Sequence, residues 1–168
     1  GINVDEIQGF IDELDRNNIK VTAKESENVE LVGNDILQIH FFDVGQADSI
    51  LLISNNKTML IDAGNNEDGT LVVNNIKKMG IKRIDYLVGT HPHEDHIGGL
   101  DDVILNFEIG TIYMPKVQTN TKTFEDVLDA IASKNLKITS PKQGDKFNIY
   151  CAFGVTSCLT LAYFFNLK

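Results

Sequence analysis

One short segment restricts the possible folds of this chain more than any other, the run LVGTHPHEDHIGGL at residues 87–100. It begins as an apolar run typical of a strand and then turns abruptly polar. Three of the four histidines of the chain and two acidic residues lie within positions 91–96. Such a cluster at the end of a strand indicates either a metal site or a polar surface loop that happens to be rich in histidine.

The rest of the chain predicts one domain with a flanking segment on each side. Residues 1–35 combine an amphipathic helix at 3–17 with a polar linker, and runs of residues typical of strands begin at residue 36. Residues 36–148 are predicted to form the main domain. Residues 149–168 form an atypical apolar tail without a charged side chain before Lys168, and its hydropathy is too weak to indicate a clear membrane segment.

Within the main domain, strand-like runs come first and then alternate with helical ones. A mixed β-sheet with helices packed on it follows from this order, which is an α/β (α+β) fold class. The runs SILLIS and TMLIDAG are predicted to form a hairpin. Strands are expected at 36–44, 49–54, 58–64, 85–90, 110–115 and 136–140, and helices at 69–80, 97–107 and 122–135.

The residue types in the cluster are suited to binding a transition metal. If the chain leaves the strand extended, His91 and His93 point to one side, while Asp95 and His96 turn toward a neighbouring position. Imidazole and carboxylate together favour zinc, manganese or iron over calcium. The glycine pair at 98–99 is expected to let a helix N-terminus approach the site and favour a bound anion.

Two motifs give a family resemblance. THPHEDHIGG resembles the HxHxDH signature of the metallo-β-lactamase fold superfamily, and FFDVGQADSILL is similar to the opening strand of its ComEC-like branch, with MLIDAG between them in the expected order. The resemblance implies an αββα sandwich, of which this chain would hold the N-terminal half. It also implies one or two divalent metal ions, zinc or else manganese, and hydrolysis of a phosphodiester or other ester by a metal-activated water.

The family's functional residues carry over one position at a time. His91 and His93 match ligands of a first metal site, and Asp95 and His96 match ligands of a second, with Asp95 also the candidate catalytic residue. Asp62, at the end of MLIDAG, matches an acidic residue that supports the ligands from behind. The remaining site-shaping candidates are Asp43, Gln46, Asp48, Gly98 and Gly99.

Some of these residues have two interpretations. Asp43 and Asp48 either shape the turn between the first two strands or face the site, and Ala47 stands in that turn where the branch usually has glycine. His40, on the first strand, is predicted to be structural, and Glu94 to be a solvated or loop-bracing acid.

The chain departs from the family pattern after the cluster. The resemblance implies two further histidine ligands downstream, yet no histidine follows His96. Three hypotheses therefore remain: a metal-dependent hydrolase, a truncated or degenerate domain that binds metal weakly without catalysis, or an oligomer whose partner completes the site.

Charge constrains the partners. Fifteen basic and twenty-four acidic side chains give a net charge of −9, which disfavours nucleic acid unless a local basic patch or bound cations reverse the field. A small-molecule ester or phosphodiester is the expected substrate. The oligomeric state stays open, and the resemblance indicates a bacterial-type protein that is either cytoplasmic or secreted.

Overall fold

The computed structural model describes residues 37–54, 56–117, 119–142, 146–147 and 159–160. The amphipathic helix and linker predicted for residues 1–35, and most of the apolar tail predicted for 149–168, lie outside the described residues. Statements below concern the described part of the chain.

Strands and helices follow the predicted order. The strands are β1 (Gln38–Phe41), β2 (Ile50–Ser54), β3 (Lys57–Ile61), β4 (Arg83–Val88), β5 (Glu108–Tyr113), β6 (Ile138–Thr139), β7 (Lys146–Phe147) and β8 (Leu159–Thr160). The helices are α2 (Gly69–Lys78), α3 (Glu94–Ile97), α4 (Leu100–Asn106) and α5 (Lys122–Ser133), with a short 3-10 helix η1 at Asn66–Asp68.

A six-stranded mixed sheet forms the centre of the domain, in the order β1-β2-β3-β4-β5-β6. The first three strands are antiparallel neighbours, so the predicted hairpin of β2 and β3 is confirmed. From β3 to β6 the strands are parallel, because a helical connection returns the chain to the same end of the sheet each time. The predicted fold class is therefore confirmed.

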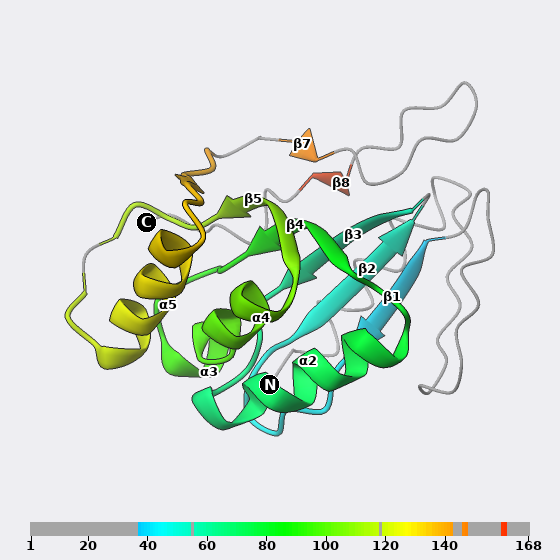
Figure 1. Cartoon of the computed structure of the whole chain (residues 1–168), viewed down its shortest axis with the longest axis horizontal. Coiled ribbons are helices and arrows are strands. Elements are labelled where there is room, and N and C mark those ends of the chain that lie inside the picture. Colours follow the sequence, from blue (N-terminus) through cyan, green and yellow to red (C-terminus); the bar gives the residue numbers. More distant parts are fainter. Residues whose placement is uncertain (1–36, 55, 118, 143–145, 148–158, 161–168) are drawn as a thin grey trace.

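Helices α2, α4 and α5 cover one face of the sheet (Figure 1). On α5 the buried side chains Phe124, Val127, Ala130 and Ile131 recur at three- and four-residue spacing, and α2 buries Val72, Val73 and Ile76 in the same way. These side chains pack on the strands as one buried apolar cluster. Of the tail, β8 is described, and it pairs antiparallel with β7.

A buried carboxylate joins the starting ends of β3 and β4. Asp85 accepts hydrogen bonds from Lys57 Nζ at 3.0 Å, from the Thr58 backbone N–H at 3.1 Å and from Arg83 Nε at 3.2 Å. The Thr58 hydroxyl in turn donates to the Arg83 carbonyl at 2.7 Å. Burial by itself raises the pKa of Asp85, but these hydrogen bonds outweigh it and hold the pKa below its ordinary value.

We expect Asp85→Asn to lower the free energy of unfolding at pH 7 by about 1–3 kcal/mol, because it weakens charge-assisted hydrogen bonds to a buried group. A carboxyl whose pKa is lower in the folded state contributes stability above its unfolded pKa and loses it as pH falls through the folded pKa. The difference between variant and wild type should therefore shrink below about pH 4. Urea unfolding at several pH values measures it.

Glu108→Gln is the matched control, because the Glu108 side chain pairs with the same Arg83 but is 70% exposed. Its effect should stay within about 1 kcal/mol at every pH. A loss for Asp85→Asn that is constant from pH 7 to pH 3 would contradict the role given to its charge.

The glycine pair after α3 lies against a second stretch of backbone. A Cβ on Gly98 would fall 2.2 Å from the Asn65 carbonyl carbon and the Asn66 nitrogen, and one on Gly99 would fall 2.5 Å from the Ala63 carbonyl oxygen. The backbone that approaches them is the connection between β3 and α2, together with Gly69 at the start of α2, whose Cα lies 2.7 Å from a Cβ on Gly99. The anion that we expect at such a helix N-terminus stays a prediction.

Gly98→Ala should lower the free energy of unfolding by more than about 2 kcal/mol, because the contact is with backbone that cannot move aside alone. Gly80→Ala is the comparison. Gly80 has a φ of +73° but open space around its Cβ position, so the cost there should be near 1 kcal/mol from backbone strain alone. Equal losses for the two variants in urea unfolding would show that the close approach at Gly98 is not rigid.

Candidate metal centre

The side chain of Asp62, directly after β3, is the deepest polar group of the site. Asp62 is 2% exposed and has a φ of +56°, a left-handed conformation that aspartate tolerates better than most residues. Its backbone N–H donates to the Val88 carbonyl at 2.8 Å, which fixes it beside the end of β4. Its Oδ1 accepts from the Thr90 N–H at 2.8 Å, and its Oδ2 accepts from the Thr90 hydroxyl at 2.5 Å.

The histidine cluster occupies the loop after β4 and the first turn of α3. Backbone hydrogen bonds from two other loops hold this segment in place. The Ala63 N–H donates to the His96 carbonyl at 2.8 Å, and the Asp48 N–H donates to the Asp95 carbonyl at 3.1 Å. The Gly64 N–H closes the set by donating to the Asp48 carbonyl at 3.0 Å. The backbone that carries the candidate ligands is thus held by the loop after β3 and by the turn before β2.

His91, Asp95 and His96 converge. One ligand atom from each lies within 4.8 Å of the other two, and the rings of His91 and His96 have centroids 3.7 Å apart. His96 Nε2 is 3.6 Å from Asp95 Oδ2, while His96 Nδ1 is 2.8 Å from Asp62 Oδ2. Helix α3 begins at Glu94, so Asp95 and His96 share one helical turn close to His91. The division into a His91–His93 pair and an Asp95–His96 pair stays a prediction.

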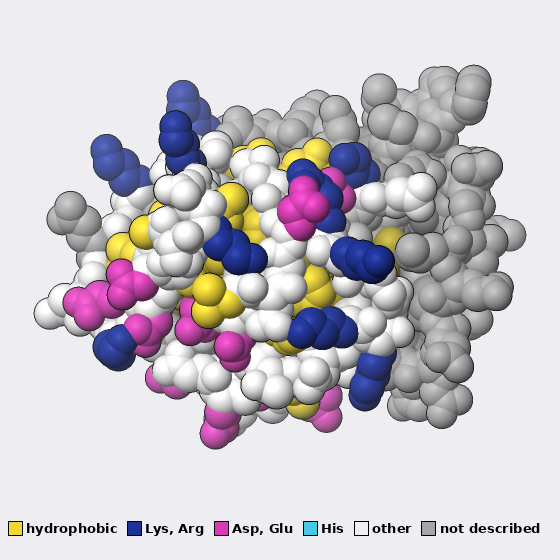
Figure 2. Space-filling view, viewed as in Figure 1, with side chains coloured by type: hydrophobic (Ala, Val, Ile, Leu, Met, Phe, Trp, Pro, Cys, Tyr) yellow, Lys and Arg dark blue, Asp and Glu magenta, His cyan; other side chains and the backbone are white. Residues whose placement is uncertain are grey.

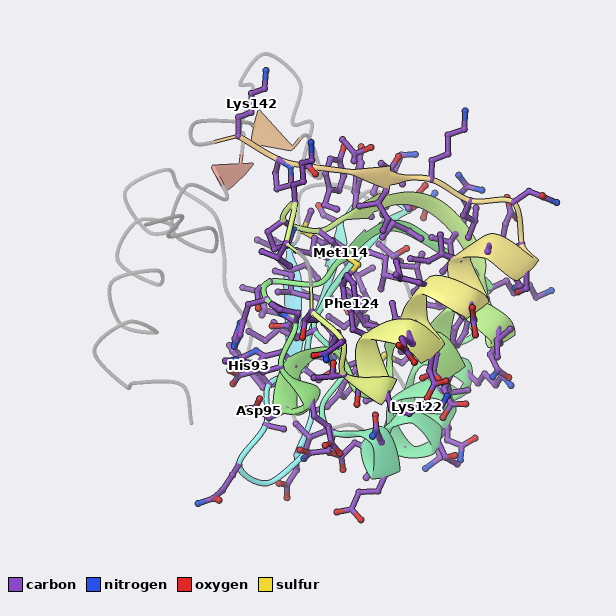
Figure 3. All side chains as sticks on the ribbon, turned by 90° about the vertical axis from the view of Figure 1, so that its left-hand side faces the viewer. His93, Asp95, Met114, Lys122, Phe124 and Lys142 are labelled. Carbon is purple, nitrogen blue, oxygen red and sulfur yellow. The ribbon has the colours of Figure 1, made fainter. Side chains whose placement is uncertain are left out.

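His93 lies at the solvent side of this group. Its ring meets the ring of His91 edge-on, with centroids 4.8 Å apart, and it is exposed. Figure 3 shows His93 and Asp95 near one another at the end of the fold where α3 begins. His93 lies beside His91 but stands outside the group of three converging donors. Its role as a ligand of a first metal site with His91 stays a prediction.

The protonation of the histidines depends on their neighbours. Burial lowers the pKa of His91, and the adjacent His96 lowers it further, so the neutral form of His91 is favoured. Burial also acts to lower the pKa of His96, but the hydrogen bond and charge of Asp62 raise it above its ordinary value. Burial raises the pKa of Asp62, against the effect of its hydrogen bonds with His96 and Thr90.

The donor set fits a divalent transition metal. Two imidazoles and one carboxylate match the ligands that zinc and manganese accept, and three protein ligands with an open position are typical of catalytic zinc sites. The Asp95 side chain is 48% exposed, so the group opens toward solvent. Asp62 behind His96 provides the carboxylate partner that ligating histidines usually have.

The turn between β1 and β2 contributes one residue to the site. Asp48 Oδ2 lies 3.7 Å from His96 Nδ1, in addition to the backbone hydrogen bonds that Asp48 makes. Asp43 and Gln46 are exposed, and Asp43 Oδ1 accepts from the Gly45 N–H at 3.4 Å within the turn. The structure thus places Asp48 at the cluster and Asp43 in the turn. His40 is buried on β1, with its Nε2 3.4 Å from Gln38 Oε1.

Thr90 is a residue at the site that was absent from our sequence-based candidates. Its hydroxyl oxygen lies 3.1 Å from His91 Nδ1 and 3.4 Å from His96 Nδ1, besides the hydrogen bond to Asp62. The available signal was its place between the apolar strand and the first histidine. A threonine there is equally well explained as a strand residue, so the sequence did not single it out.

Charge is distributed unevenly over the fold. Figure 2 shows most Asp and Glu side chains toward the left and lower edge of the helical face, while Lys and Arg side chains are spread over both ends of it. Acidic residues stand in the first turns of α4 and α5, whereas Lys77 and Lys78 stand in the last turn of α2. Helices α4 and α5 begin where the parallel strands end, so their acidic first turns lie toward the end that carries the histidine cluster. Both placements complement the helix dipoles.

Among the described residues, no helix is long and apolar enough to cross a membrane.

Comparison with known proteins finds one similar curated protein and several similar solved structures. The chain is 25% identical over 134 residues to ComE operon protein 3 of Bacillus subtilis (strain 168), covering 67% of this chain and 17% of that protein. Among solved structures, the metallo-beta-lactamase SMB-1 bound to 2-mercaptoethanesulfonate is 21% identical with a TM-score of 0.48, covering 65% of this chain and 46% of that one. A diphosphatase from the PhnP family is 24% identical with a TM-score of 0.39, covering 60% and 38%.

The chain thus spans less than a fifth of the curated relative and less than half of these solved structures. A family model gives the more specific result. The model of the metallo-beta-lactamase superfamily matches residues 42–152, which include the turn after β1, Asp62 and the whole histidine cluster. This protein therefore belongs to the metallo-beta-lactamase superfamily.

Proposed function

We propose that this domain, placed at residues 36–148, is a metal-dependent hydrolase of the ComEC-like branch that acts on a phosphodiester or another ester. The observation that carries the proposal is the convergence of His91, Asp95 and His96 in front of a buried carboxylate. A polar surface loop rich in histidine has no need of that carboxylate, which is costly to bury. The 25% identity to ComE operon protein 3 supports the choice of branch.

The proposal gives each residue of the cluster a role. His91 and His96 would hold a divalent cation through ring nitrogens, and Asp95 would hold it through a carboxylate oxygen. Asp62 orients His96, because its Oδ2 is 2.8 Å from the Nδ1 that faces away from Asp95. His93, exposed beside His91, is available to a second cation.

Zinc or manganese bound at this group would supply Lewis-acid chemistry, polarising an ester and activating water for attack. The chain supplies the arrangement around that chemistry. Asp95 Oδ2 lies 3.6 Å from His96 Nε2, and its half-exposed carboxylate can accept a hydrogen bond from a water that enters from solvent. Asp95 is therefore the proposed catalytic residue. The loops held by Asp48 and Ala63 keep the donors in place before any substrate arrives.

The charge pattern bears on the substrate. Acidic side chains at the cluster end attract cations but repel long polyanions, so a small ester or phosphodiester fits the site better than a nucleic acid that spans the surface. A nucleic acid substrate would require bound cations to reverse the local field.

A second candidate rests on one observation: the chain has no histidine after His96. Under this alternative, the domain is a degenerate member of the superfamily that binds metal weakly and does not catalyse. The two candidates differ in metal content and turnover.

We expect the purified chain, loaded with zinc or manganese and desalted, to retain near-stoichiometric metal and to hydrolyse bis-p-nitrophenyl phosphate. His91→Ala and Asp95→Ala should each lower both the retained metal and the rate by at least about 10-fold, because each removes one of three converging donors. Elemental analysis and release of nitrophenol measure the two quantities.

Glu94→Gln is the matched control, since Glu94 lies between the candidate ligands but is exposed and stands outside the converging group. It should match wild type in both quantities. Turnover that survives both alanine substitutions would defeat the assignment of the site, and loss of the metal on desalting together with absent turnover would favour the alternative that binds metal weakly without catalysis.

A further inference from the structure

We propose that Thr90 is a positioning residue that fixes the tautomer of His91: its hydroxyl donates to Asp62 and accepts from His91 Nδ1–H, leaving the Nε2 lone pair of His91 free. The inference rests on the proposed function, because a free Nε2 is useful to a site that holds metal. It assigns a role to a residue that is not itself a candidate ligand.

The argument begins with the hydrogen-bond capacity of Asp62. An ionised carboxylate can only accept, and three groups lie within hydrogen-bond distance of its oxygens. The Thr90 N–H faces Oδ1 at 2.8 Å, while the Thr90 hydroxyl and His96 Nδ1 face Oδ2 at 2.5 and 2.8 Å. To an ionised Asp62, all three of these groups donate. His96 then carries a hydrogen on Nδ1, and its Nε2 faces Asp95.

The same counting extends to His91. The Thr90 hydroxyl has one hydrogen, and Asp62 Oδ2 takes it. The Thr90 oxygen can then only accept from its other neighbours, of which His91 Nδ1 at 3.1 Å is nearer than His96 Nδ1 at 3.4 Å. His96 already directs its Nδ1 hydrogen to Asp62, so the remaining bond comes from His91. His91 must hold its hydrogen on Nδ1, which leaves Nε2 as an acceptor.

The buried carboxylate of Asp62 thus sets the tautomers of two imidazoles, that of His96 directly and that of His91 through the Thr90 hydroxyl. The hydrogen bonds of the Asp62 side chain go to Thr90 and His96, so Asp62 reaches the tautomer of His91 only through the Thr90 hydroxyl. Because metal ligation requires an unprotonated ring nitrogen, selecting the tautomer in advance avoids a rearrangement when a cation binds.

The experiment reads the tautomer and the zinc affinity separately, in the full chain. Two-bond ¹⁵N–¹H spectra of the metal-free protein, assigned with single histidine substitutions, should show wild-type His91 with its hydrogen on Nδ1. In Thr90→Val, which keeps the shape and removes the hydroxyl, this preference should be lost. Zinc affinity, measured by competition with a chromophoric chelator, should fall by about 10-fold or more.

Thr90→Ser restores the hydroxyl and should restore both readouts, and Thr70→Val, at an exposed position on α2, should change neither. Wild-type His91 with its hydrogen on Nε2 would overturn the inference, and this measurement does not depend on the folding of a Thr90 variant. So would Thr90→Val with the wild-type tautomer and affinity. If wild type binds no zinc, the proposed function fails, while the tautomer of His91 still decides the role of Thr90.

Discussion

The structure around the histidine cluster depends on one buried carboxylate. Asp62 follows β3 in a left-handed conformation, and its backbone is tied to the end of β4 through Val88. A charge removed from water is costly unless several donors surround it, and the loop after β4 supplies three. The hydrogen bonds that the buried Asp62 carboxylate requires therefore also fix the positions of His96 and Thr90.

The parallel half of the sheet makes this meeting possible. Ile61 and Val88 are register partners at the ends of β3 and β4, so the residues that follow each strand emerge side by side although 28 positions separate Asp62 from Thr90. The turn before β2 reaches the same place, where Asp48 holds the Asp95 carbonyl. Three loops thus converge at one edge, which is where α/β sheets usually place chemistry.

The close contact of these loops is also a matter of side-chain size. Gly98 and Gly99 let the segment after α3 lie against the connection from β3 to α2 at distances that a Cβ would not allow. Helices that begin at this edge direct their amide ends toward it, and the acidic side chains of α4 and α5 gather there. Acidic side chains of the described helices therefore lie at the edge where a cation would bind.

The sequence by itself determined the order of strands and helices, the hairpin of β2 and β3, the mixed sheet and the superfamily, because these follow from local periodicity and from motifs contiguous in the chain. It also placed all candidate ligands within residues 91–96. Only the tertiary structure decided which of them meet. His91 groups with Asp95 and His96 because α3 begins at Glu94, Asp48 separates from Asp43 because one faces the cluster and the other the turn, and Thr90 acquires three polar neighbours because β3 ends beside β4. The contacts of Asp48 and Asp62 with this segment join residues distant in sequence, and no local pattern encodes them.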